Sequence, residues 1–161
     1  MLIVVLDCIR KAQNLAAVMR LMAATNADVY LTGDVLRHDH RKVKNHMQKW
    51  ARLNNPDEVD KIVNVRYVET LQELIKNFRS QGYRIIGTTP SADTIYTELD
   101  YSRDDFVLIF GPEVSGLSQE KLDMLDVKLR IPMRNDIDSL NLTNSVSIIL
   151  YEALRQQGFK F

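Results

Sequence analysis

The chain has 161 residues, of which 45% are hydrophobic and 26% charged, values typical of one folded globular domain and not of a disordered or fibrous protein. Its 21 Lys and Arg residues balance 21 Asp and Glu residues, so the formal net charge is zero. The lone cysteine, Cys8, excludes an internal disulfide, and no apolar run reaches the about 18 residues that a membrane span requires. We therefore expect a cytoplasmic protein without a membrane partner.

Short apolar runs alternate with helical patterns along the whole chain. This alternation predicts an α/β fold with a mostly parallel, six-stranded sheet and helices on both faces, in one domain that covers residues 1–161. Cys8, at the end of the first strand, is expected in the core. The six expected strands are Leu2–Leu6, Asp28–Leu31, Val63–Val68, Arg84–Thr88, Phe106–Phe110 and Val127–Ile131.

The segments between these strands carry apolar residues at helical spacing. The first such helix contains residues 15–22. A capping box of Thr70 and Glu73 begins a second helix, which ends before Gly82, and Ser118 is expected to cap a helix over 119–125. The final long helix is marked by Leu142, Val146, Ile149, Leu150 and Ala153.

Charges are segregated along the chain although they cancel in total. The segment 37–52 holds six Lys and Arg against one Asp, whereas residues 93–105 hold five acids against one Arg. Val43, Met47 and Trp50 form one apolar stripe in the basic segment, so its charges should point outward. Clustered Lys and Arg residues are typical of a surface that binds the phosphate backbone of RNA. The alternative interpretation is a helix face that is merely exposed to solvent.

Three loops follow strands at the expected carboxyl edge of the sheet, where open α/β sheets bind ligands. They contain Thr88-Thr89-Pro90, residues 111–118 and residues 132–141. The second loop has two glycines around Glu113, but it lacks the GxGxxG pattern of dinucleotide sites, the Gly-Lys-Ser/Thr of a P-loop and the GxSxG of a nucleophile elbow. The residues alone are consistent with either a structural turn or a cradle for a small molecule.

Asn14 and Arg20 lie six residues apart on the first predicted helix. Arg20 is surrounded by apolar residues, so we expect it to be partly buried and to need a carboxylate or phosphate partner. The alternative is a structural salt bridge, with Asn14 as a simple helix cap. The histidines lack the spacing of metal ligands, so we expect no metal site and assign them to the surface or to RNA; they are His38, His40 and His46.

Three ordered motifs together resemble one known family. They are Asn14-Leu15-Ala16-Ala17-Val18-Met19-Arg20, then Leu108-Ile109-Phe110-Gly111-Pro112-Glu113-Val114-Ser115-Gly116-Leu117, then Ile131-Pro132-Met133 followed by Asp138-Ser139-Leu140-Asn141-Leu142. In this order and at this spacing the chain resembles the SPOUT superfamily of knotted RNA methyltransferases over nearly its whole length. The match is to the SpoU (TrmH-like) branch, which methylates ribose 2′-hydroxyls.

The resemblance implies S-adenosylmethionine as cofactor, bound in a deep C-terminal trefoil knot, and an obligate homodimer. It implies a cofactor site formed by Thr88, Thr89, Gly111, Glu113, Ile131, Met133 and Leu140. It implies a catalytic constellation formed by Asn14, Arg20, Glu113, Ser139 and Asn141. We expect no N- or C-terminal RNA-binding extension, so RNA would be bound by Arg10, Lys11, Arg41, Lys42, Lys44 and Lys49.

The family proposal for Arg20 is that it acts as the base for the ribose hydroxyl, but a guanidinium with a pKa above about 12 does not lose its proton in a protein. We expect Arg20 to hold a phosphate next to the target and to stabilise the developing alkoxide. Two segments depart from the family pattern. Asn26, which tolerates left-handed backbone, stands in place of a glycine turn, and residues 142–145 are unusually polar.

The sequence thus predicts methylation of a ribose 2′-hydroxyl in structured RNA. A D-loop guanosine and the anticodon wobble nucleotide of tRNA are the leading targets, and ribosomal RNA is an open alternative. A non-catalytic RNA-binding module would have no reason to keep all five catalytic residues. A nucleotide-dependent oxidoreductase is disfavoured by the missing glycine fingerprint.

Overall fold

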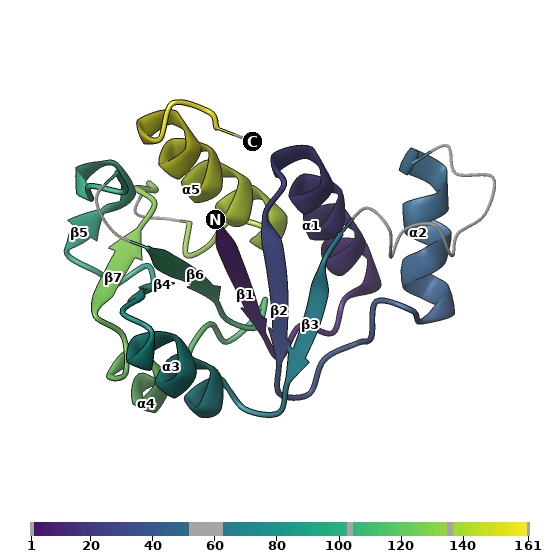
Figure 1. Cartoon of the computed structure of the whole chain (residues 1–161), viewed down its shortest axis with the longest axis horizontal. Coiled ribbons are helices and arrows are strands. Elements are labelled where there is room, and N and C mark those ends of the chain that lie inside the picture. Colours follow the sequence, from purple (N-terminus) through teal and green to yellow (C-terminus); the bar gives the residue numbers. More distant parts are fainter. Residues whose placement is uncertain (1, 52–62, 103–104, 135–136, 161) are drawn as a thin grey trace.

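Seven parallel strands form one sheet in a computed structural model that describes residues 2–51, 63–102, 105–134 and 137–160 (Figure 1). The strand order is β3-β2-β1-β6-β4-β7-β5, and every pairing is parallel. All carboxyl ends therefore meet at one edge of the sheet. The strands are β1 (Ile3–Asp7), β2 (Asp28–Thr32), β3 (Val65–Val68), β4 (Arg84–Thr88), β5 (Thr94–Ile95), β6 (Phe106–Phe110) and β7 (Val127–Arg130).

The prediction of six strands is wrong by one. The additional strand, β5, is two residues long and pairs with the end of β7 through Thr94 and Ile95. Two residues are too few to show an alternating pattern, and neither is fully buried, so hydrophobicity did not mark them. The other six strands lie where they were expected; β4 and β6 have the predicted ends, and the ends of the other four differ by at most two residues.

Helices cover both faces of the sheet, as predicted. In β1, Val4 and Leu6 pack into one apolar cluster while Ile3 and Val5 pack into the other, which is the period-two alternation of a strand buried on both faces. On the first face lie α1 (Ala12–Thr25), α2 (Arg41–Ala51) and α5 (Leu142–Gln156), and on the second lie α3 (Leu71–Ser80) and α4 (Gln119–Leu122).

Most helix ends follow the predicted signals. Thr70 Oγ1 accepts a hydrogen bond from the backbone N–H of Glu73 at 3.2 Å, as the capping box requires. Asn26 closes α1 in left-handed backbone with φ 51°, so the turn that lacks glycine still forms. The helix after Ser118 was predicted to reach Leu125, but α4 ends at Leu122, because the chain continues in a turn whose N–H groups at Met124 and Leu125 bond three residues back. Within the described residues no helix is long and apolar enough to cross a membrane.

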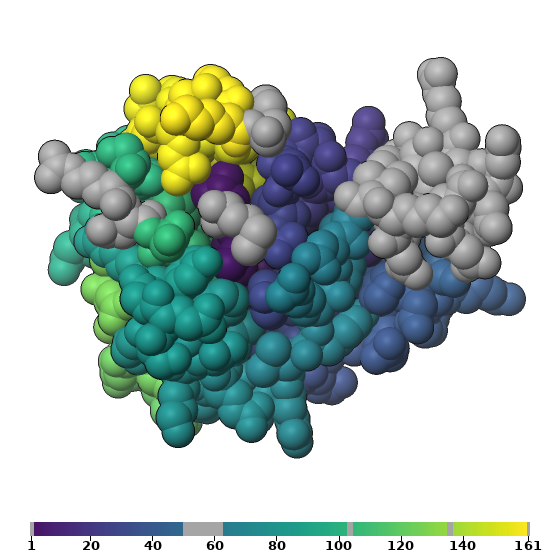
Figure 2. Space-filling model, viewed as in Figure 1, coloured from purple at the N-terminus to yellow at the C-terminus, as the bar shows by residue number. Residues whose placement is uncertain are grey.

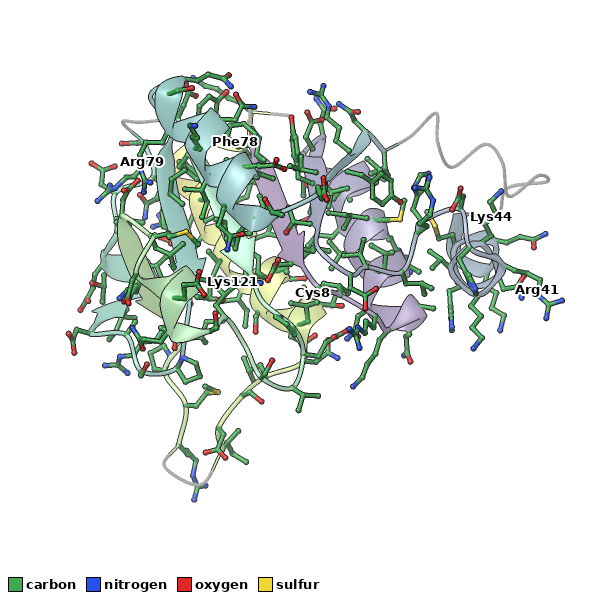
Figure 3. All side chains as sticks on the ribbon, turned by 90° about the horizontal axis from the view of Figure 1, so that it is seen from below. Cys8, Arg41, Lys44, Phe78, Arg79 and Lys121 are labelled. Carbon is green, nitrogen blue, oxygen red and sulfur yellow. The ribbon has the colours of Figure 1, made fainter. Side chains whose placement is uncertain are left out.

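The basic segment forms α2, which packs beside α1 at the right of Figure 1. Val43 and Met47 are fully buried there, as the apolar stripe predicted. In Figure 2 the blue atoms of this region lie at the lower right of the molecule, and Figure 3 shows Arg41 pointing away from the body. The Trp50 side chain and Arg52 lie outside the described residues.

The prediction that Cys8 lies in the core is wrong. Cys8 is half-buried and has left-handed backbone with φ 56°, because β1 ends at Asp7 and the chain turns out of the sheet at the next residue. The buried residue at this strand end is Asp7, which accepts hydrogen bonds from Thr32 Oγ1 at 2.9 Å and Lys121 Nζ at 2.6 Å. The ion pair joins α4 to the end of β1, where Lys121 and Cys8 lie close together (Figure 3).

The end of α5 is joined to the segment after β5 by a set of side-chain hydrogen bonds. Gln156 donates from Nε2 to the Leu99 carbonyl at 3.0 Å and accepts at Oε1 from the Tyr101 N–H at 2.9 Å. Tyr101 is fully buried, and burial, together with the charge of Glu152, raises the pKa of its phenol. Glu152 accepts two hydrogen bonds from Arg155 and one from Gln156, which lower its pKa from 4.5 to about 2.

Replacing Glu152 by Gln is expected to lower Tm at pH 7 by about 2–4 °C. A carboxyl whose pKa is depressed in the folded state stabilises the fold above its unfolded pKa and loses this contribution as pH falls. The difference in Tm between the wild type and Glu152→Gln should therefore shrink between pH 4.5 and about pH 2, which thermal unfolding followed by circular dichroism measures. Glu120→Gln, on the exposed side of α4, is the matched control. A pH-independent difference would contradict the assignment.

Candidate active site

A pocket of about 220 Å³ opens at the carboxyl edge of the sheet, where β4, β6 and β7 end side by side. Its walls come from the loops after these three strands and from the start of α5. All residues that the sequence analysis assigned to the cofactor line this pocket. They are Thr88, Thr89, Gly111, Glu113, Ile131, Met133 and Leu140.

The loop after β6 folds back on itself so closely that one position must be glycine. A Cβ on Gly111 would lie 2.5 Å from the backbone nitrogen of Leu117 and 2.6 Å from the carbonyl carbon of Gly116, so any side chain would displace the backbone. Gly116 has φ +64°, a conformation that L-residues rarely adopt. The two glycines shape a wall in which backbone groups, instead of side chains, approach a ligand.

A chain of hydrogen bonds links three segments beside the pocket. Asn14 Nδ2 donates to Glu113 Oε1 at 3.0 Å, and Asn141 Nδ2 donates to Asn14 Oδ1 at 3.2 Å. Asn14 is 6% exposed and lies inside α1, whose cap is Lys11, so the alternative of a simple helix cap is wrong. The network fixes the half-buried Glu113 carboxylate at the pocket wall, because each partner is held in turn by the next.

Four of the five residues assigned to catalysis are thereby brought together. Glu113 and Ser139 line the pocket, and Asn14 and Asn141 reach it through Glu113. Arg20 is different. It lies six residues after Asn14 on α1, is exposed and does not line the pocket, so the expectation of a partly buried arginine is wrong. Helix geometry explains this, since a rotation of 100° per residue turns Arg20 away from Asn14.

The residues assigned to RNA lie on two neighbouring segments. Arg10 and Lys11 are exposed in the turn between β1 and α1, and the Leu36 N–H donates to the Ile9 carbonyl at 2.9 Å, which joins this turn to the loop that leads into α2. Arg10 also forms an ion pair with Asp34 in that loop. Of the assigned residues on α2, Arg41, Lys42 and Lys49 are exposed and Lys44 is half-buried.

The histidines stand near this basic region. His38 bonds to the Tyr67 hydroxyl through both its backbone N–H and its ring, and His40 Nδ1 accepts from the Lys42 N–H at 3.1 Å. His46 is exposed on α2. Among the residues that the structure describes, no group of three or more His, Cys, Asp or Glu side chains could hold a metal ion.

Several residues that line the pocket were missed in the sequence. Arg130 ends β7 and lines the pocket directly before Ile131, Asp138 lines it from the segment that leads into α5, and Ser145 lines it from the first turn of α5. The signal for Arg130 was available, because it precedes the Ile131-Pro132-Met133 motif by one residue. A polar residue beside a motif residue has no periodic pattern of its own, so only the folded chain shows that it faces the pocket.

Comparisons with known proteins agree with this geometry. The model of the SpoU rRNA methylase family matches residues 1–151. A candidate tRNA (cytidine(34)-2′-O)-methyltransferase of Bacillus subtilis is 34% identical over 151 residues, which cover 91% of this chain and 88% of that protein. An uncharacterized tRNA/rRNA methyltransferase of Synechocystis is 31% identical over 154 residues, 95% of this chain but only about half (53%) of that protein.

Solved structures share the fold. One, reported for the 2-OH methylation of C/U34 on tRNA, has a TM-score of 0.84 at 27% identity and covers 99% of this chain and 98% of its own. An AdoMet-bound rRNA methyltransferase from Sinorhizobium meliloti has a TM-score of 0.82 at 25% identity and covers 95% of this chain and 55% of its own. Because the family model matches residues 1–151 and the Bacillus subtilis relative is 34% identical over 91% of this chain, the chain belongs to the SpoU rRNA methylase family.

Proposed function

We propose that the protein transfers a methyl group from S-adenosylmethionine to the 2′-hydroxyl of the wobble nucleotide, position 34, of a tRNA. The observation that carries this proposal is that all seven expected cofactor residues line one pocket, with the Asn141–Asn14–Glu113 network at its wall. The Bacillus subtilis relative and the C/U34 structure both concern position 34, which favours the wobble nucleotide over a D-loop guanosine. The AdoMet-bound structure supports the cofactor.

The residues present fit S-adenosylmethionine. Gly111 lets the loop after β6 fold back on itself and form the pocket wall, and Thr88, Thr89, Ile131, Met133 and Leu140 supply backbone and apolar contacts for a nucleoside. When bound, the cofactor supplies a methyl group on a positively charged sulfur, which is open to in-line displacement. In our proposal the segment around the pocket forms a deep trefoil knot. The knot would tie the loops that follow β6 and β7 to each other.

The chain's own residues then position the ribose and accept its developing charge. Asn14 and Asn141 orient Glu113, and the exposed Ser139 hydroxyl at the pocket supplies a further hydrogen bond. Arg20 keeps its proton, holds a phosphate beside the target and stabilises the alkoxide. The proton of the 2′-hydroxyl leaves through that phosphate or through water.

The proposal includes a homodimer. Large apolar side chains are exposed on the loop after β6, on the segment before α5, on α5 itself and on the residues after it. A second copy of the chain would cover them. Sedimentation velocity checks this, because the expected species has the mass of two chains at micromolar concentration. These residues are Val114 (92% exposed), Ile137 (52%), Leu140 (36%), Tyr151 (42%) and Phe159 (47%).

Methylation of purified RNA tests the proposed function. The protein is incubated with labelled S-adenosylmethionine and either unmodified total tRNA or ribosomal RNA, and the methylated ribose is mapped by its resistance to alkaline hydrolysis. We expect one resistant site, at position 34 of one or a few tRNAs. Label in ribosomal RNA alone would assign the other target, cofactor binding without transfer would favour an RNA-binding module, and no cofactor binding would reject the activity.

The basic residues around α2 and in the turn before α1 are proposed to bind the RNA. The proposal also includes a single domain and a cytoplasmic location, where its RNA substrate is found. Reversing two charges with Lys42→Glu and Lys44→Glu is expected to weaken tRNA binding by at least about tenfold and to flatten its dependence on salt, because fewer counterions are released. Kd for S-adenosylmethionine should not change. Filter binding from low to high salt measures the first, and calorimetry the second.

The matched control carries the same change of charge elsewhere, with Lys76→Glu on α3 and Lys128→Glu on β7. Equal losses in both double variants would mean that total charge, and not α2, sets the affinity. Unchanged RNA affinity in Lys42→Glu, Lys44→Glu would show that this helix face is merely solvated and that RNA docks elsewhere.

A further inference from the structure

Arg130 is half-buried at the end of β7 and stands between two cavities. Within the described part of the chain its guanidinium forms no hydrogen bond, ion pair or ring contact. Arginine presents five N–H donors in a rigid fork that matches carboxylate and phosphate groups, and holding the side chain half out of water without an anion is costly. The missing partner is therefore a bound anion.

The second cavity shows where this anion lies. It has a volume of about 320 Å³ and adjoins the cofactor pocket, with which it shares Pro90, Ile131, Met133 and Asp138 as well as Arg130. Arg134 lines only this side cavity. Among the described residues, the charged groups of its lining are the guanidiniums of Arg130 and Arg134 and the carboxylate of Asp138, so a phosphodiester group would meet two cationic side chains there.

Position separates two possible anions. A carboxylate of the cofactor would lie in the cofactor pocket, which Arg134 does not line, whereas an anion in the side cavity would lie beside both Arg130 and Arg134. A phosphate of the RNA is the anion that would enter this cavity from outside the cofactor pocket. In an RNA chain every ribose has one phosphate on either side, so a target ribose at the mouth of the pocket brings two phosphates close to it. Arg20 takes one of them in the function proposed above.

We propose that the side cavity binds the second phosphate that flanks the target ribose, with Arg130 as its main ligand and Arg134 at its outer wall. This proposal rests on the proposed function and adds a substrate-binding residue to it. Arg130 lies between cofactor and RNA, and it fixes the ribose in line with the methyl donor through the phosphate.

The experiment compares Arg130→Ala with the wild type on an anticodon stem-loop RNA. We expect KM and Kd for this RNA to rise about 10- to 100-fold, because a charge-assisted contact is lost. The slope of log K against log salt should decrease by about 0.7, the value for one contact to single-stranded RNA. Kd for S-adenosylmethionine, measured by calorimetry, should stay within about twofold.

Lys128→Ala is the matched control. Lys128 lies two residues earlier on β7, so it is on the same side of the strand, and it loses the same charge, but it lines neither cavity and pairs with Asp123 at 3.6 Å. We expect Lys128→Ala to keep the RNA affinity and salt slope of the wild type. An equal loss in both variants would overturn the proposal, because it would reflect charge alone.

A second measurement leaves the protein unchanged. Neutral methylphosphonate groups are placed one at a time on either side of the target ribose. Wild-type binding should weaken at both positions, because Arg20 and Arg130 each hold one phosphate, and Arg130→Ala should not distinguish native from neutral RNA at one of them. Loss of cofactor affinity with intact RNA affinity would assign Arg130 to the cofactor carboxylate. Absence of methylation by the wild type would instead overturn the proposed function.

Discussion

Arg20→Ala is expected to lower kcat for tRNA methylation by about a hundred- to a thousandfold, the loss seen when one group that stabilises a developing oxyanion is removed. Arg20 is exposed on α1 and lies outside the pocket, so its guanidinium is on the surface that RNA would approach and not beside the cofactor. Kd for S-adenosylmethionine should accordingly change by less than about twofold. Single-turnover methylation and calorimetry measure the two quantities.

Two controls sharpen this test. Arg20→Lys keeps the charge but loses the planar set of N–H donors. Its methylation rate should therefore lie between those of Arg20→Ala and the wild type, and its cofactor affinity should be unchanged. Lys76→Ala on α3 removes a cation from the opposite face of the sheet and should leave the rate unchanged. Full activity in Arg20→Ala would exclude both a basic and an electrostatic role for this residue.

Gly111→Ala is expected to weaken S-adenosylmethionine binding by at least about tenfold and to destabilise the fold by about 1–3 kcal/mol, the range for forcing an extra methyl group into a packed site. The new Cβ would overlap two backbone atoms, at 2.5 Å and 2.6 Å, so the loop after β6 has to move. Calorimetric titration with the cofactor and denaturant unfolding measure the two effects.

Gly82→Ala separates pocket shape from general strain. Gly82 has φ +85° after α3, and a Cβ there would meet nothing within 4 Å. This variant should lose about 1 kcal/mol of stability and keep the cofactor affinity of the wild type. If Gly111→Ala bound S-adenosylmethionine as tightly as Gly82→Ala does, the pocket would not be the cofactor site.

The elements that the sequence predicted well are those with long, periodic patterns. Strands such as β1 and β6 are buried on both faces and read as continuous apolar runs, and α3 carries both a cap and a full apolar stripe. The elements that it predicted less well are short. β5, which was missed, has two residues, and the helix predicted over 119–125 forms only as the four residues of α4; such short segments form because neighbouring elements hold them, not because of local preference.

The site was predicted only in part, for a different physical reason. Asn14 meets Glu113, 99 positions later, because β1 lies beside β6 in the sheet, and periodicity does not encode strand order. Ordered motifs pointed to the residues without giving their contacts. They could not show that Arg20 is exposed or that Arg130 faces two cavities, since both depend on how distant segments pack.

Asn141 illustrates why this site tolerates little variation. Its Oδ1 accepts a hydrogen bond from the Thr143 N–H at 2.9 Å, which caps α5, while its Nδ2 donates to Asn14. Asp at position 141 would keep the cap but would place a carboxylate oxygen against the Asn14 Oδ1 acceptor. Ser has only one polar atom for the two contacts, and the Gln side chain is one methylene too long. The Asn141 amide therefore both caps α5 and holds Asn14 in place. A substitution at this position disturbs the helix start, the site or both.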